Sequence, residues 1–258
     1  MPDVPDVLGV AVTRAEEDAD ALASALTGAG LTAIGAPLLR VTPLPPDALA
    51  AELRSGGFDW TVCTSRHAVE ALGAACASLQ APPAEAVRGR LGAVGRRTAG
   101  ALEALGLHVD LVPAVSDAMH LADAMLALDA TPQRVLFPRA REAREALPAA
   151  LRQAGWTVVD VVAYDTVPNE AGGAALCESL AAGTIAAITL ASGSAARALA
   201  SLVPRALWSR ARLVSIGPTT TADAAACGLP IAAQAETPTM ASLAEATRRI
   251  LLDSLAHA

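Results

Sequence analysis

Short apolar runs alternate along the chain with longer stretches rich in Ala and Leu that end at Gly. The run Val10–Val12, for example, is followed by Leu22 and Leu26 at helical spacing and then by Gly30. This alternation predicts βα units, because short apolar runs indicate buried strands and the longer stretches indicate helices. Repeated βα units predict an α/β fold with parallel sheets flanked by helices. The expected strands are residues 7–12, 33–37, 59–63, 91–94, 109–112, 134–137, 157–162, 185–190, 212–216 and 230–233.

The chain also matches itself at an offset of about 122 to 127 residues. Each matched block has the same form, with a short apolar run, a small polar turn and a helical stretch. The repeat predicts two similar small α/β domains. The matched blocks are Val10–Arg14 with Val135–Arg139, Thr61–Val69 with Ile188–Ala196, Leu91–Thr98 with Leu213–Thr220, and Leu121–Ala124 with Leu243–Ala246.

Two segments interrupt the alternation. Pro37–Pro46 carries four prolines, and Val161–Pro168 occupies the equivalent place in the second repeat. Their composition favours extended backbone. We expect them to run side by side as linkers between two domains, with a cleft beside the hinge.

Composition excludes several classes of function. All 19 basic residues are Arg, and the missing lysine amine rules out Schiff-base and pyridoxal-phosphate enzymes, Walker-A nucleotidases and protein kinases. A net charge of −7 argues against a nucleic-acid partner. The four cysteines form no C-x-x-C pair and no histidine spacing suits a metal, so we expect no metal, no cofactor and a cytoplasmic location. The longest uncharged runs are interrupted by Gly or Pro, so no membrane span is expected.

Small hydroxyl residues follow several expected strands, where helices begin. Helix N-termini expose N–H donors, and open α/β sheets bind ligands outside the carboxyl ends of their strands. These turns together predict a polyanionic ligand, although each alone could be an ordinary helix cap. Arg139 could bind a carboxylate, but Glu142 and Glu145 beside it favour a salt-bridged surface. The predicted binding residues are Thr13, Arg14, Thr64, Ser65, His67, Thr98, Arg139, Ser192, Gly193, Ser194, Thr219 and Thr220.

The order and spacing of these segments resemble the uroporphyrinogen-III synthase family over nearly the whole chain. The chain departs from the family pattern at His67, where Asn is usual, at Ala191, where a hydroxyl residue is usual, and at Thr221, where Ala is usual. The segments that carry the resemblance are Val12–Arg14, Phe58–Ser65 with Ala68 and Val69, Ala93–Gly95 with Thr98 and Ala99, Tyr164, and Ile216–Thr220.

The resemblance implies an enzyme of haem biosynthesis that acts on hydroxymethylbilane, a linear tetrapyrrole with eight carboxylates. The reaction closes the ring with inversion of ring D and loss of water, giving uroporphyrinogen III. The resemblance also implies a discontinuous first domain of residues 1–37 and 166–258, an inserted second domain of residues 42–160, and paired linkers at 38–41 and 161–165.

Tyr164, the single tyrosine of the chain, resembles the linker tyrosine of the family. The resemblance makes it the candidate catalytic residue, assisting departure of the hydroxyl group, whereas its place in the linker equally allows a hinge-packing aromatic. Two other functions stay open: a non-catalytic binder of an anionic metabolite, and an inactive paralogue of the synthase. We expect a monomer, since no sustained heptad pattern is present.

Overall fold

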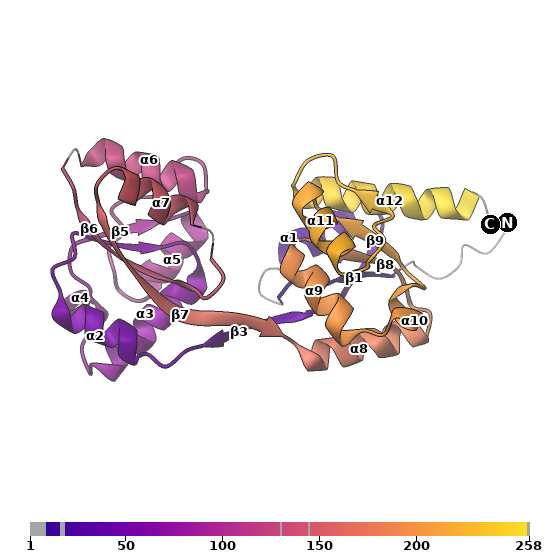
Figure 1. Ribbon diagram of the computed structural model, residues 1–258, viewed down its shortest axis with the longest axis horizontal. Coiled ribbons are helices and arrows are strands. Elements are labelled where there is room, and N and C mark those ends of the chain that lie inside the picture. The colour runs from indigo at the N-terminus through magenta and orange to yellow at the C-terminus, as the bar shows by residue number, and fades with distance from the viewer. Residues whose placement is uncertain (1–8, 16–18, 130, 144, 257–258) are drawn as a thin grey trace. The chain divides into compact units, whose positions relative to one another are not determined.

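The computed structural model describes residues 9–15, 19–129, 131–143 and 145–256, which form two compact units (Figure 1). Unit 1 comprises the described residues up to Arg40 and from Val167 onward, and unit 2 those of Val41–Thr166. Each unit is a sheet of mostly parallel strands with helices on both faces. The predicted α/β fold class is therefore confirmed.

Unit 1 contains a parallel sheet with the strand order β10-β9-β8-β1-β2. When the five strands are numbered along the chain and read from β2 to β10, they lie in the order 2-1-3-4-5. Strand β2 is therefore added on one side of β1 and strands β8, β9 and β10 on the other, so the strand order reverses between β1 and β8. The strands are β1 (Gly9–Val12), β2 (Thr32–Gly35), β8 (Ile185–Leu190), β9 (Arg212–Ser215) and β10 (Ala233–Gln234).

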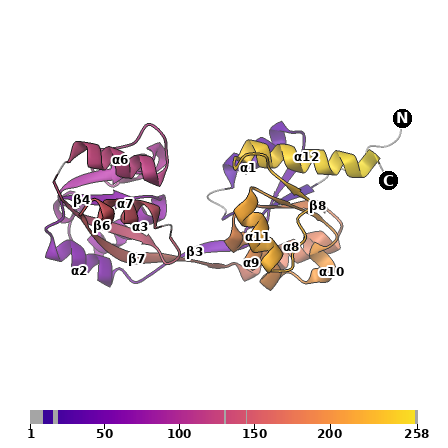
Figure 2. The same ribbon diagram turned by 45° about the horizontal axis from the view of Figure 1, so that its top comes forward.

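The helices of unit 1 form two layers (Figures 1 and 2). Leu and Ala side chains of one group pack on the β1 side chains Val10 and Val12, and the other group packs around Ala11. The first group is α1 (Asp20–Gly28) and α12 (Met240–Ala256), and the second is α8 (Glu170–Ala181), α9 (Gly193–Leu202), α10 (Arg205–Trp208) and α11 (Pro218–Ala226).

Unit 2 contains the sheet β3-β7-β6-β4-β5, in which β7, β6, β4 and β5 run parallel. Strands matched by the sequence repeat hold equivalent places in the two sheets: β6 corresponds to β1, β4 to β8 and β5 to β9. Each sheet therefore combines strands from both halves of the chain. The strands are β3 (Leu39–Pro43), β4 (Trp60–Cys63), β5 (Arg90–Ala93), β6 (Arg134–Ala140) and β7 (Thr157–Pro168).

Helices cover both faces of the unit 2 sheet. One apolar cluster includes Leu72 and Leu102, and the opposite cluster includes Leu121 and Leu147. The helices of the first face are α2 (Asp47–Ser55), α3 (Arg66–Ser78), α4 (Pro83–Ala86) and α5 (Arg96–Ala104), and those of the second are α6 (Ala118–Leu128) and α7 (Ala146–Gln153).

The largest differences between the structure and the predicted elements lie in three places. Residues 39–43, expected as a linker, form β3 next to β7, where the sheet supplies hydrogen-bond partners that sequence pattern alone does not show. Strand β7 continues to Pro168 instead of ending near residue 162. The expected strand 109–112 is reduced to a single bridge between Gly92 and Leu111, because Pro113 follows and cannot donate to a ladder.

One helical glycine is required by close packing. A Cβ on Gly172 of α8 would lie 2.0 Å from the carbonyl oxygen of Pro37, which already accepts a 2.8 Å hydrogen bond from Asn169 Nδ2. Gly100 of α5, in contrast, has no atom within 4 Å of its ideal Cβ position.

We expect Gly172→Ala to lower the free energy of unfolding by about 2 kcal/mol, because the helix must shift away from Pro37. The matched control Gly100→Ala should raise it by up to about 1 kcal/mol, since alanine favours an open helical position. Urea denaturation monitored by circular dichroism measures both changes. Equal effects of the two substitutions would contradict this packing account.

Candidate functional site

The predicted binding turns follow the carboxyl ends of neighbouring strands. In unit 1, Thr13 and Arg14 follow β1, and Ser192 follows β8, the two strands between which the sheet order reverses. In unit 2, Thr64 and Ser65 follow β4, whose neighbour β6 ends near Arg139. Ligands of open α/β sheets bind at such reversals, so each unit has one candidate edge.

Matching serines cap the helices at these edges. Ser65 Oγ accepts a 3.2 Å hydrogen bond from the Ala68 amide at the start of α3. Ser192 Oγ accepts a bond of the same length from the Ala195 amide at the start of α9, and also lies 3.1 Å from Ser194 Oγ. The repeat therefore gives two equivalent caps in different surroundings.

Tyr164 contacts two other predicted residues of unit 2, Ser65 and His67. Its hydroxyl lies 2.8 Å from Ser65 Oγ, although 99 residues separate the two in the sequence. The Tyr164 and His67 rings are tilted by 50° with their centroids 5.7 Å apart. The tyrosine side chain belongs to an apolar cluster, and the residue is only 8% exposed.

Burial raises the pKa of the Tyr164 phenol above its usual value. The hydrogen bond with Ser65 acts in the opposite direction, the nearby Cys63 raises the pKa, and the Ala140 backbone lowers it. Complete burial also raises the pKa of the Cys63 thiol to about 12. Both groups therefore stay protonated at neutral pH, and the phenol can act as a proton donor.

His67 lies on the first turn of α3 beside this pair. Its Nδ1 atom lies 3.1 Å from Glu70 Oε2, which fixes the ring on the helix surface. Its Nε2 atom is buried and has no hydrogen-bond partner within the described part of the chain. The ring therefore packs against Tyr164 instead of pointing freely to solvent.

Arg139 is held by carboxylates of the protein itself. Its guanidinium lies 3.1 Å from Glu145 and 3.7 Å from Asp160. Arg152 shares both carboxylates, with a 3.6 Å contact to Glu145 and a direct hydrogen bond to Asp160. Arg139 thus forms the salt-bridged arrangement that its acidic neighbours in the sequence favoured.

Several predicted hydroxyls are buried in unit 1 or unit 2. Thr13 is fully buried, and its hydroxyl donates to the Thr189 carbonyl at 2.7 Å while Thr189 Oγ1 donates to the Ala11 carbonyl at 2.8 Å. This exchange joins β1 to β8, so the Thr13 hydroxyl supports the sheet. Thr98 and Thr220, in the first turns of α5 and α11, are each 5% exposed.

The remaining predicted residues are accessible to different degrees. Arg14, Thr64, Gly193 and Ser194 are half-buried, and Thr219 is exposed. A Cβ on Gly193 would lie 1.7 Å from an Asp223 carboxylate oxygen, so glycine is needed here for α11 to approach α9.

Sequence reasoning missed the polar contacts of Thr221. Its hydroxyl lies 2.6 Å from Ser215 Oγ, at the end of β9, and donates to Gln234 Oε1 at 2.7 Å. The Thr-Thr-Thr run at 219–221 was a possible indication, but only the structure shows which hydroxyl bonds to the sheet. Thr221 therefore links α11 to the strand ends, next to the exposed Thr219.

Comparison with known proteins identifies the family. Residues 20–245 match the sequence model described as uroporphyrinogen-III synthase HemD. The chain belongs to the uroporphyrinogen-III synthase family. It is 31% identical, over 71% of its length and 73% of the relative's, to a protein of Methanothermobacter thermautotrophicus that is provisionally named a uroporphyrinogen-III synthase.

Solved structures of the synthase family share this fold. Uroporphyrinogen-III synthetase from Helicobacter pylori matches 98% of this chain and 100% of its own, with a TM-score of 0.60 and 17% identity. A mutant uroporphyrinogen III synthase from Thermus thermophilus matches 96% of this chain and 100% of its own, with a TM-score of 0.56 and 20% identity. At these identities the likeness supports the fold.

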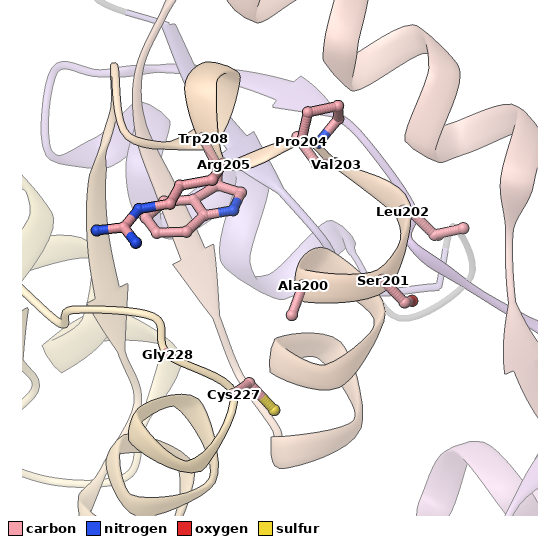
Figure 3. Close-up of a pocket in the computed structure, with 9 residues that line it drawn as sticks. All are labelled: Ala200, Ser201, Leu202, Val203, Pro204, Arg205, Trp208, Cys227 and Gly228. Atoms are coloured by element: carbon pink, nitrogen blue, oxygen red, sulfur yellow. The ribbon is translucent and has the colours of Figure 1, made fainter.

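Two of the surface hollows outside the Tyr164 region lie at ends of the helices that follow the predicted binding turns. One of about 620 Å³ in this synthase-family chain begins at Arg96 and Arg97, on the first turn of α5, and is closed by Pro113 and Ser116. The other, of about 400 Å³, lies where α9 and α11 end and is lined by Arg205, Trp208 and Cys227 among others (Figure 3). The second is at the helix C-termini, opposite the predicted binding edge of unit 1.

Two further observations concern the described residues only. None of their helices combines the length and the apolar character that a membrane span requires. They also contain no group of three or more His, Cys, Asp or Glu side chains placed to hold a metal ion.

Because Cys63 is buried, the stability of this synthase-family protein should depend on pH in the alkaline range. The thiol has a pKa of about 12 when folded, against 9.0 for an unperturbed thiol, so the unfolded chain releases this proton first. We expect the ionisation of Cys63 in the unfolded chain to lower the free energy of unfolding by up to about 1.4 kcal/mol per pH unit as the pH rises from 9 towards 12.

Urea denaturation of the reduced protein at several pH values measures this slope. Cys63→Ala should lose stability less steeply above pH 9 than the wild type, whatever its stability at neutral pH, because the ionisable group is gone. Parallel stability curves for the two proteins would contradict a protonated Cys63 in the folded state.

Proposed function

We propose that the protein is a uroporphyrinogen-III synthase that cyclises hydroxymethylbilane, with inversion of ring D and loss of water, to give uroporphyrinogen III. The observation that carries the proposal is the family match over residues 20–245. The hydroxyl-rich turns at the carboxyl ends of both sheets support it, because such turns suit a polycarboxylate substrate.

In this proposal the accessible hydroxyls and helix N-termini hold the acid arms of the substrate. The half-buried Thr64 in unit 2, and Ser192, Ser194 and the exposed Thr219 in unit 1, have the required position and accessibility, and the half-buried Ser65 meets the substrate at the same edge of unit 2. Buried Thr13, Thr98 and Thr220 contribute to the shape of the turns instead. Arg14, His67 and Gly193 stay candidate contacts.

The proposed reaction depends on the positioning of the substrate more than on strong acids or bases. Departure of the terminal hydroxyl leaves a resonance-stabilised azafulvene cation, and the carbon that attacks it decides whether ring D is inverted. Holding flexible acid arms in one geometry favours a single attack over direct closure. Tyr164 is the source of the proton that assists departure of the hydroxyl, and the proposal includes no metal and no cofactor.

The assignment of domains and linkers is part of the same proposal. We assign the two units as the two domains, with linkers near residues 38–41 and 161–165. The cleft between the domains, the cytoplasmic location, the monomeric state and the absence of a nucleic-acid partner stay predictions.

The proposal is tested by supplying purified protein with freshly generated hydroxymethylbilane, oxidising the products and separating the isomers by chromatography. Spontaneous closure gives the type I isomer, so we expect a protein-dependent excess of type III. Unaltered type I product with retained binding of the substrate would contradict the proposal and favour a non-catalytic binder. Unaltered product without binding would favour an inactive paralogue.

Tyr164→Phe should lower turnover by about 100-fold, because it removes the proton donor and keeps the buried ring. Its far-UV circular dichroism and urea midpoint should stay close to those of the wild type, since the ring still fills the apolar cluster. An unchanged rate of type III formation would remove Tyr164 from the mechanism.

A further inference from the structure

Tyr164 is the less exposed residue of its hydrogen-bonded pair. Tyr164 is 8% exposed and packs in the apolar cluster of unit 2, whereas Ser65 is half-buried at the start of α3. A substrate at the carboxyl edge of the sheet therefore meets the serine before the phenol. The chemical role that we draw from this difference in exposure rests on the proposed function.

The hydrogen-bonding capacity of Ser65 suits a link between the phenol and a substrate. A serine hydroxyl has one donor and two acceptor positions. One acceptor position takes the Ala68 N–H at 3.2 Å, and the second can take the Tyr164 O–H at 2.8 Å. With both filled, the serine O–H is left to donate outward.

We propose that Ser65 donates the proton to the departing hydroxyl of the substrate and that Tyr164 resupplies Ser65 from behind. As the carbon–oxygen bond breaks, its electron pair leaves with the oxygen, which takes the Ser65 proton and departs as water. The Tyr164 proton moves to Ser65 Oγ, leaving a phenolate. When the final pyrrole carbon loses its proton, that proton returns by the same route, and both residues are restored.

Two features beside the pair offset part of the cost of a temporary phenolate in this buried position. Ser65 can turn to donate to it, and the amino end of the 13-residue helix α3 favours negative charge nearby. Burial keeps the resting phenol protonated by raising its pKa, with Cys63 adding to this effect. His67 packs on the ring and is held by Glu70, so it limits movement of the phenol.

The repeat supplies a matched control for testing the contact. Ser192 makes the same 3.2 Å cap bond as Ser65, but its hydroxyl faces Ser194 instead of a tyrosine. Ser65→Ala and Ser192→Ala therefore remove equal caps and should destabilise the protein to a similar extent. Ser65→Gly keeps most of the cap stability without the hydroxyl and replaces Ser65→Ala if that variant does not fold.

Because Tyr164 is the single tyrosine, a protein labelled with ¹³C at tyrosine Cζ gives one resonance in the NMR spectrum. We expect this resonance to move in Ser65→Ala and Ser65→Gly and to stay in place in Ser192→Ala. The measurement needs no substrate, so it judges the contact even if the proposed reaction fails. The same resonance position in all four proteins would overturn the proposal.

A double-mutant cycle on kcat tests the relay itself. Ser65→Ala and Tyr164→Phe should each lower kcat by about 100-fold, and the double variant should lose no more than either alone, because both interrupt one proton route. Ser65→Thr should keep most of the wild-type kcat, since it keeps the hydroxyl. Multiplied losses, or a Ser65→Ala effect confined to KM, would overturn the relay. If the wild type itself forms no type III isomer, the proposed function has failed, and that result is distinct from both others.

Discussion

The parallel hydrogen-bonded ladder of each sheet is the constraint on which the rest of the structure depends. Parallel strands joined by helices place every strand-to-helix turn at the same edge of the sheet. The turn after β1 therefore lies next to the turn after β8, although about 180 residues separate them in the sequence. The hydrogen bonds from the Thr13 hydroxyl to the Thr189 carbonyl and from the Thr189 hydroxyl to the Ala11 carbonyl strengthen this junction from within the sheet.

The same constraint explains how a tyrosine and a serine far apart in the chain form one group in unit 2. Strand β4 delivers Ser65 to the N-terminus of α3, and β7 places Tyr164 beside it across β6. The tyrosine is buried because β7 continues past the point where the sequence pattern ends the strand, and its side chain joins the apolar cluster. Burial keeps the phenol protonated, and the serine connects it to the edge where a polycarboxylate is expected.

More of the fold than of the candidate site could be predicted from the sequence, because strand and cap patterns are local and the surroundings of a site are not. Strand 185–190 was predictable to the residue because buried parallel strands are mostly apolar, and every residue of this one except Thr189 is apolar. Strand β3 was not, because the prolines in and around it obscure the short apolar–polar alternation of residues 39–42 and its partner β7 is distant in sequence. At the site, Ser65 and Ser192 cap helices as their sequence positions indicated, since capping is local. The burial of Thr13 and the ion pairs of Arg139 depend on neighbouring strands and helices, which no local pattern reports.

The central claim is that the carboxyl-edge turns of the two units hold the acid groups of a polycarboxylate tetrapyrrole. A crystal structure of the protein with uroporphyrinogen III tests this claim most directly. The account predicts carboxylate groups on the N-terminal turns of α3 and α9, with at least one within hydrogen-bond distance of Ser65 or Ser192. A ligand held instead in the hollow beside Trp208, at the opposite end of α9, would contradict it.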